Sequence, residues 1–236
     1  MFYIDWTYII YVLPAILFAM WASSRVNTTF DRYSKVATRK GMTGRDAARA
    51  VLDANGLYHV RVERISGNLT DHYDPKSDVI RLSDSTYGNS SCAAIGVAAH
   101  EAGHAIQHAT GYVPIRIRTA IVPITNIGAK LSMPLILIGI LLSALGEAYA
   151  VIAYAGVACF ALSTLFQLVT LPTEFNASRR AVAAIEDCGM LDESETDGAK
   201  KVLSAAALTY VAALFVSIMQ LLRLLAIVSR SSNRRR

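Results

Sequence analysis

The sequence predicts a mainly α-helical integral membrane protein that has three or four transmembrane helices and a small antiparallel β-sheet. Of its 236 residues, 53% are apolar, and the mean hydropathy is +0.37. Charged residues still make up 17% of the chain, but they are concentrated in residues 24–118 and 172–202. Long apolar runs fill the rest, which is typical of membrane spans joined to a modest soluble part.

The first apolar segment is predicted to be an N-terminal transmembrane anchor over residues 1–24. No lysine or arginine precedes it, and its end lacks the small residues of a signal-peptide cleavage site. Basic residues then follow closely: Arg25, Arg32, Lys35, Arg39 and Lys40. The positive-inside rule therefore places residues 25–118 in the cytoplasm and the amino terminus outside.

Two further apolar segments, 121–144 and 149–171, are separated only by a few residues around Glu147. We therefore expect residues 119–171 to form an antiparallel transmembrane hairpin. A hairpin crosses the bilayer twice, so residues 172–202 return to the cytoplasmic side.

The last apolar segment, 202–228, is interrupted by Gln220 and Arg223. Residues 203–236 are predicted to form an apolar helix followed by a basic tail. Three arrangements fit this segment: a span, which we favour; a long helix that packs on the soluble part first and enters the lipid late; and an amphipathic helix along the membrane surface. A span would leave the basic tail outside, against the positive-inside rule.

Residues 25–118 have the pattern of a short helix followed by a small sheet. Thr43 and Asp46 resemble a capping box, which begins a helix that Gly56 ends. Three strand candidates separated by turn residues follow, and we expect them to form an antiparallel sheet: 58–65, 69–73 and 79–82.

A second helix is predicted from Cys92 to about Ala109. Ser90 or Ser91 is its N-cap, and Gly111 follows its end. The helix is apolar almost all round, so we expect it to be buried.

The segment His100-Glu101-Ala102-Gly103-His104 places two histidines four residues apart in this helix. Four residues advance about 400° around a helix with 3.6 residues per turn, so both imidazoles can bind one zinc ion. Glu101 lies where it can take a proton from water that the metal activates. Burying these groups without a purpose would cost several kcal/mol. We therefore favour a zinc site over a helix whose histidines are merely hydrogen-bonded.

A catalytic zinc ion has three protein ligands, so one must come from elsewhere in the chain. Glu174 is the best candidate, because the hairpin returns it to the side of His100 and His104, and Pro172 suits the first turn of a new helix. The alternative is a solvated glutamate that the helix dipole favours. His108 lies about 6 Å further along the helix axis than His104 and is not expected to bind the metal.

Four stretches resemble the YugP-like membrane zinc metallopeptidases, a bacterial family of the gluzincin type: LTDHYDP (69–75), HEAGHAIQ (100–107), EFNASRRA (174–181) and VLSAAALTYVAAL (202–214). With the order of the apolar segments, the similarity covers nearly the whole chain. It implies a gluzincin-like core around the zinc helix, with one Zn²⁺ bound by His100, His104 and Glu174, and with Glu101 as the general base. Related gluzincins often carry an aspartate where this chain has Ser178, whose hydroxyl is a weaker partner for the histidines.

Together these features predict a membrane-embedded zinc metalloendopeptidase of the bacterial cell membrane that hydrolyses peptide bonds of membrane-associated proteins or peptides on the cytoplasmic side. Residues 25–118 would carry the zinc helix and residues 172–202 the third ligand. An exposed edge of the sheet could hold the substrate as an added strand, although a sheet that only packs has the same pattern. His72, Tyr73 and Tyr210 are candidates for substrate or transition-state contacts, but simple packing explains the two tyrosines at least as well.

Two other function classes fit the sequence less well. A catalytically silent zinc-containing scaffold or adaptor has no use for Glu101, and a structural site fills its fourth position with protein. A transporter would need more ionisable groups inside the apolar segments than Lys130 and Arg223.

Composition limits the partners to a protein or peptide substrate and the lipid bilayer. The net charge of +5 accompanies no nucleic-acid-binding motif, which excludes nucleic acid as the expected partner. The three cysteines are widely spaced, so we assign them no disulfide or thiol chemistry.

Overall fold

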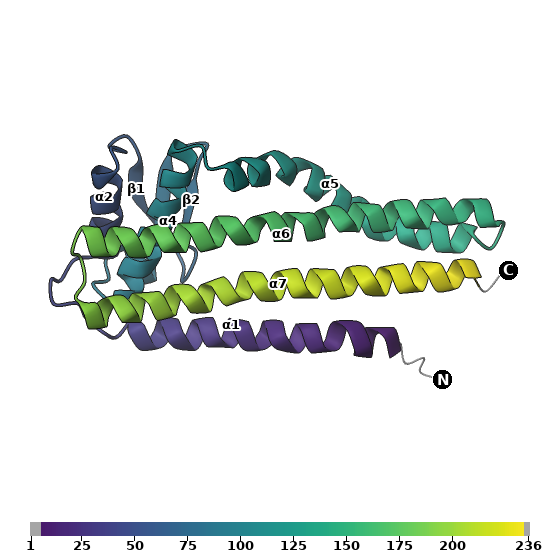
Figure 1. Cartoon of the computed structure of the whole chain (residues 1–236), viewed down its shortest axis with the longest axis horizontal. Helices are drawn as coiled ribbons and strands as arrows, with labels where there is room; N and C mark the ends of the chain where they lie inside the picture. The colour runs from purple at the N-terminus through teal and green to yellow at the C-terminus, as the bar shows by residue number, and fades with distance from the viewer. Residues whose placement is uncertain (1–5, 234–236) are drawn as a thin grey trace. The chain divides into compact units, whose positions relative to one another are not determined.

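The computed structural model describes residues 6–233 (Figure 1). The chain divides into two compact units. The first, here the helical unit, consists of Met1–Trp21, Ile117–Leu171 and Tyr210–Arg236. The second, here the mixed unit, consists of Ala22–Arg116 and Pro172–Thr209. Residues 1–5 of the expected anchor and residues 234–236 of the expected basic tail lie outside the described residues.

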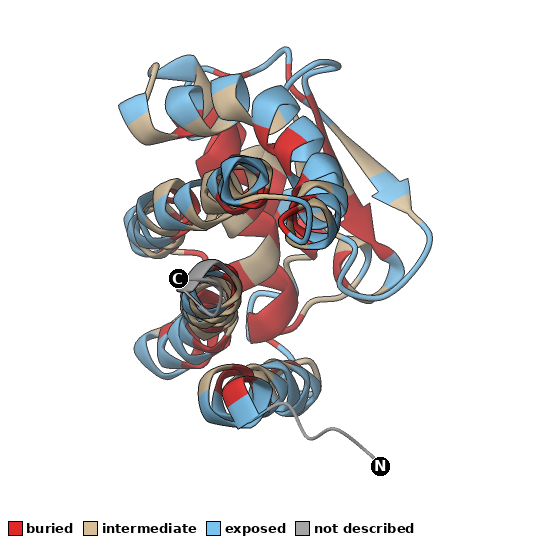
Figure 2. Ribbon diagram, turned by 90° about the vertical axis from the view of Figure 1, so that its right-hand side faces the viewer, coloured by how far each residue is buried: buried red, intermediate tan, exposed pale blue. Residues whose placement is uncertain are grey.

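Among the described residues, four helices are long and apolar enough to cross a membrane. Their bounds are α1 (Leu13–Tyr33, preceded by the π-helical turn η1, Tyr8–Val12), α5 (Val113–Leu142), α6 (Ala150–Asp187, preceded by the 3₁₀ turn η2, Glu147–Tyr149) and α7 (Glu193–Asn233). Between 17% and 28% of each apolar window is buried, and Figure 2 shows many exposed residues along these helices. Their apolar faces are therefore largely uncovered, as lipid-facing helices require. The predicted class, a mainly helical membrane protein, is confirmed.

Close packing in the helical unit depends on small residues. A side chain at Gly156 of α6 would lie 2.7 Å from the carbonyl oxygen of Ser132 in α5, so the glycine lets the two backbones approach. The helix α7 joins α6 through a hydrogen bond between the hydroxyls of Thr164 and Ser217 (2.8 Å). Such small and hydroxyl-bearing contacts are typical of helices that associate in lipid, where apolar burial alone gives little driving force.

The mixed unit begins with α2 (Gly44–Ala54), whose predicted capping box is present. The hydroxyl of Thr43 accepts from the N–H of Asp46, and the carboxylate of Asp46 accepts from the N–H of Thr43, both at 3.2 Å. A one-turn helix, α3 (Asp84–Tyr87), was not predicted.

The small sheet is mixed rather than wholly antiparallel. Its strands are β1 (Arg61–Ile65), β2 (His72–Asp74) and β3 (Val79–Ser83), in the order β1-β3-β2. The pair of β2 and β3 is antiparallel as expected, but β1 runs parallel to β3. This order follows from the burial of β3, which is the most apolar strand. Because β3 buries Val79, Ile80 and Leu82, it takes the centre of the sheet, and the more polar strands β1 and β2 lie at the edges.

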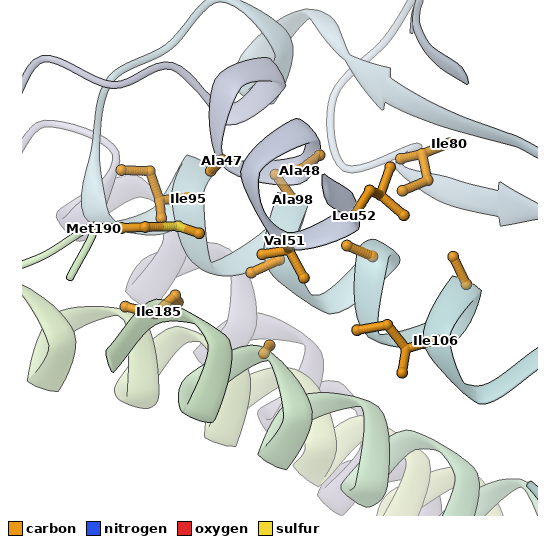
Figure 3. Close-up of a cluster of buried hydrophobic side chains, with 14 of the residues drawn as sticks. Ala47, Ala48, Val51, Leu52, Ile80, Ile95, Ala98, Ile106, Ile185 and Met190 are labelled. Carbon is orange, nitrogen blue, oxygen red and sulfur yellow. The ribbon is translucent and has the colours of Figure 1, made fainter. Parts of the chain in front are cut away.

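The helix α4 (Cys92–Ala109) has the predicted bounds, and the hydroxyl of Ser91 caps it by accepting from the N–H of Ala94 (3.2 Å). Figure 3 shows its buried side chains gathered with those of α2, β3 and the carboxyl-terminal part of α6. The labelled members include Val51, Leu52, Ile80, Ile95, Ile106 and Ile185. Burial of α4 in this cluster holds its histidines in fixed positions.

Pro172 does not begin a new helix, contrary to the sequence-based expectation. It lies inside α6, which runs unbroken from Ala150 to Asp187. Proline removes one helical hydrogen bond, at a cost of about 3 kcal/mol, but the helix-forming residues on both sides continue the helix past it. The apolar segment and Glu174 therefore share one helix.

Candidate metal centre

Three side chains from two helices of the mixed unit converge on one point. His100 and His104 come from α4, and Glu174 comes from α6. The Nε2 atom of His100 lies 3.3 Å from Oε2 of Glu174, and Nε2 of His104 lies 3.4 Å from the same oxygen. One ligand atom from each residue lies within 4.8 Å of the other two.

These distances are long for charge-assisted hydrogen bonds and match the spacing of two ligand atoms on one zinc ion. A charge-assisted hydrogen bond between imidazole and carboxylate is typically about 2.7–2.9 Å long. Ligand atoms that sit about 2.0–2.1 Å from a tetrahedral zinc are about 3.3–3.4 Å from one another. The two separations from Glu174 are therefore compatible with a shared metal ion, and all three ligand atoms lie within 4.8 Å of one another.

Charge supports the same interpretation. Glu174 is 3% exposed and Glu101 is 8% exposed, so two carboxylates are buried beside two imidazoles. Burial alone would lower the pKa of His104, but its hydrogen bond with Glu174 and the negative charge of Glu101 outweigh this effect and raise the pKa. The pocket therefore favours positive charge, and a divalent cation would neutralise both carboxylates.

Each histidine has a partner for its other ring nitrogen. Nδ1 of His100 lies 3.1 Å from the hydroxyl of Ser178, and Nδ1 of His104 lies 3.0 Å from Oε1 of Gln107. Such contacts leave both Nε2 atoms facing the position between the three ligands. The sequence pointed to Ser178 as a weak partner but not to Gln107.

Glu101 is buried in α4 and is not one of the three converging residues. Its Oε2 accepts a hydrogen bond from the backbone N–H of Tyr73 in β2 (3.0 Å). This contact holds the carboxylate between the helix and the strand. The negative charge of Glu101 also acts on His104, and its role as a general base stays a prediction.

The remaining candidate residues have different positions. The hydroxyl of Tyr73 donates to Asp78 (2.7 Å); burial and this hydrogen bond raise its pKa well above the ordinary value of 10.0. The ring of His108 packs against that of Tyr73, with 5.5 Å between centroids, and His108 is not in the three-residue cluster. His72 is exposed, with Nδ1 near the carbonyl oxygen of Thr70, and Tyr210 belongs to the helical unit.

Sequence analysis missed a buried polar group behind His104. Gln107 is fully buried and donates to the carbonyl oxygen of Thr173 (2.8 Å) and to Oδ1 of Asn176 (3.0 Å). A polar residue three positions after a histidine, on an otherwise apolar helix, was the available indication.

Comparison with known proteins indicates a family of zinc metallopeptidases. The family model described as "Putative neutral zinc metallopeptidase" matches residues 8–229. The chain is also 44% identical over 220 residues to a Bacillus subtilis (strain 168) protein described as "Putative membrane protease YugP", covering 93% of this chain and 96% of that protein. No solved structure matches significantly. Since the family model matches nearly the whole chain, this protein belongs to the family that bears that description.

Proposed function

We propose that this protein is a membrane-embedded zinc endopeptidase that hydrolyses peptide bonds of membrane-associated proteins or peptides. One observation carries the proposal: two histidine Nε2 atoms lie 3.3 and 3.4 Å from a single oxygen of Glu174, a spacing that the ligands of one zinc ion can adopt. His100, His104 and Glu174 would hold one Zn²⁺ per chain, and the fourth position would stay open for water and substrate.

When bound, the zinc ion supplies Lewis acidity, which activates water at neutral pH and polarises a carbonyl group. Glu101 accepts the proton of the attacking water and then passes it to the leaving amine. The N–H of Tyr73 keeps the Glu101 carboxylate oriented for this transfer. His100 and His104 act as neutral ligands, each with its Nδ1 held by a neighbouring side chain.

The strand β2 is the part of the chain best suited to hold the substrate. It lies at an edge of the sheet, and its Tyr73 N–H points to Glu101 rather than to β3. The edge of β2 that does not pair with β3 therefore lies beside the candidate general base. An extended peptide that adds to this edge through main-chain groups other than the Tyr73 N–H, which Glu101 occupies, would bring its backbone close to the metal position.

The proposed location is the bacterial plasma membrane, with the site on the cytoplasmic side. Four candidate spans and similarity to a protein described as a membrane protease support a membrane location. The basic residues that follow the first apolar segment support a cytoplasmic site, because such residues stay on the inner side.

Metal analysis and hydrolysis assays of the protein purified in detergent micelles test the function. We expect about one zinc per chain in the wild type and in Glu101→Gln, and loss of zinc in Glu174→Ala. Hydrolysis of a micelle-reconstituted single-span membrane protein should stop with chelator and return with added zinc. Glu101→Gln should lower the rate by about 10²–10⁴-fold.

The same assays separate the proposal from a silent zinc scaffold. If the protein is a silent scaffold, it should bind zinc, and the wild type and Glu101→Gln should both hydrolyse the substrate only at the background rate. That outcome, or full zinc occupancy in Glu174→Ala, would overturn the proposal. A soluble unstructured protein, casein, serves as the second substrate, and we expect slower cleavage of casein than of the membrane protein.

A further inference from the structure

A chain of hydrogen bonds runs behind His104, away from the metal position. His104 Nδ1 lies 3.0 Å from Oε1 of Gln107, whose side chain is fully buried. The amide of Gln107 donates to Oδ1 of Asn176, and the guanidinium of Arg180 donates to the same oxygen (2.8 Å). We refer to Gln107, Asn176 and Arg180 as the amide relay.

The ends of the relay settle which atom of each amide faces which neighbour. A guanidinium has only donors, so Asn176 must turn its oxygen, not its nitrogen, toward Arg180. The backbone carbonyl of Thr173 has only acceptor capacity, so Gln107 must turn its nitrogen toward Thr173 and Asn176. The oxygen of Gln107 is then left facing His104.

This orientation selects one form of the His104 ring. The Gln107 oxygen can only accept, so Nδ1 of His104 must carry a proton. In the neutral ring, Nε2 then presents its lone pair toward Glu174, which is the form a metal needs. A flipped Gln107 amide would put two donors against Nδ1 and favour the opposite tautomer.

We propose that Gln107 is a positioning residue that fixes His104 in its metal-binding tautomer, and that the carbonyl oxygen of Thr173 and Arg180, acting through Asn176, together set the orientation of the Gln107 amide. The inference rests on the proposed function, because it takes His104 as a zinc ligand. It adds three residues that are neither proposed metal ligands nor the proposed general base, and it explains why a glutamine lies buried in α4.

The test measures zinc affinity by competition with a chromophoric chelator, using purified full-length protein in detergent micelles. Gln107→Met keeps the side-chain length but removes the acceptor, and should weaken zinc binding about 10- to 100-fold. Arg180→Met should weaken zinc binding several-fold, since the side-chain amide of Asn176 can then turn its nitrogen toward Gln107. Asn176→Asp keeps the shared acceptor and should stay close to the wild type. Arg179→Met, at the exposed neighbouring position, is the matched control and should leave affinity unchanged.

A second readout separates positioning from a general loss of structure. In ¹⁵N-histidine NMR spectra of the metal-free protein, the His104 resonances are assigned by their absence in His104→Gln. Wild type and Asn176→Asp should show protonated Nδ1 and unprotonated Nε2 for His104 at high pH, whereas Gln107→Met should show the other tautomer or a mixture. The thermal unfolding midpoint of each metal-free variant checks the fold.

The outcomes distinguish this inference from the proposed function. If Gln107→Met folds and keeps both wild-type zinc affinity and the wild-type tautomer, the positioning role is wrong while the zinc site stands. If Arg180→Met and Arg179→Met behave alike, the relay does not extend to Arg180. If His104→Gln binds zinc as tightly as the wild type, it is the proposed zinc site that fails.

Discussion

At the residue scale, Gly103 controls how closely the two ligand-bearing helices approach. A side chain at this position of α4 would lie 2.8 Å from the carbonyl oxygen of Ala177 in α6. Ala177 stands between Glu174, the candidate third ligand, and Ser178, the partner of His100. A methyl group at 103 would therefore push the third ligand away from the two histidines.

We expect Gly103→Ala to weaken zinc binding at least 10-fold and to cost about 1–3 kcal/mol of folding free energy through overpacking. Chelator competition and denaturant unfolding measure the two effects. Gly88→Ala is the control, because no atom lies within 4 Å of a side chain built at Gly88. Equal zinc affinity in the two variants would mean that α6 moves without disturbing the site.

At the element scale, the contact between β2 and α4 couples the sheet to the candidate general base. The N–H of Tyr73 donates to Glu101 rather than to the ladder with β3. Proline is tolerated on an edge strand where the N–H is not part of the ladder. A proline at position 73 can therefore remove the hydrogen bond from the Tyr73 N–H to Glu101 without disrupting the pairing of β2 with β3.

Tyr73→Pro should keep zinc bound and lower kcat, because the Glu101 carboxylate loses the donor that orients it. Tyr73→Phe keeps that N–H and removes only the hydroxyl that donates to Asp78, so its kcat should stay within a few-fold of the wild type. Steady-state hydrolysis and zinc content of both variants check this. A larger loss of kcat in Tyr73→Phe would instead assign the catalytic effect to the hydroxyl.

The elements that the sequence predicted well depend on local patterns. The helix from Cys92 to Ala109 and the capping box of α2 both follow from residues close together in the chain. The parallel pairing of β1 with β3 joins residues separated by the whole of β2, and no turn motif encodes it. The prediction that Pro172 begins a new helix was wrong for a related reason. It considered only the residues next to the proline and not the long helix that continues on both sides of it.

At the candidate site, the segment from His100 to His104 predicted two ligands and Glu101 as the base, since a spacing of four residues in a helix brings the two imidazoles together. The candidate ligand Glu174 needed the count of membrane crossings and the family resemblance. The amide relay was beyond reach, because Asn176 and Arg180 become meaningful only when α6 is known to pack beside Gln107.

At the scale of the whole molecule, the long helices exceed what a bilayer needs. At 1.5 Å per residue, the 41 residues of α7 extend about 60 Å, roughly twice the thickness of the hydrocarbon core. About half of α7 must therefore lie outside the hydrocarbon. The same holds for the 38 residues of α6, whose residues from Pro172 onward belong to the mixed unit.

The chain's own cysteines make the proposed topology testable. Cys188 is exposed in the turn after α6, whereas Cys92 is buried. If the site faces the cytoplasm, a membrane-impermeant maleimide should label Cys188 only after the cells are permeabilised. Glu147 lies in the exposed turn between α5 and α6, so Glu147→Cys in a Cys188→Ser background should be labelled in intact cells.

The Cys188→Ser variant alone measures any background from Cys92 and Cys159. If Cys188 were labelled in intact cells and Glu147→Cys were not, the orientation of the chain in the membrane would be the reverse of the proposed one, and the site would face outward. Labelling of both positions from the same side would mean that α5 and α6 do not cross as a hairpin. In that case Glu174 would reach the histidines of α4 without two membrane crossings, and the topological argument for this ligand would fail although the 3.3 Å and 3.4 Å contacts remain.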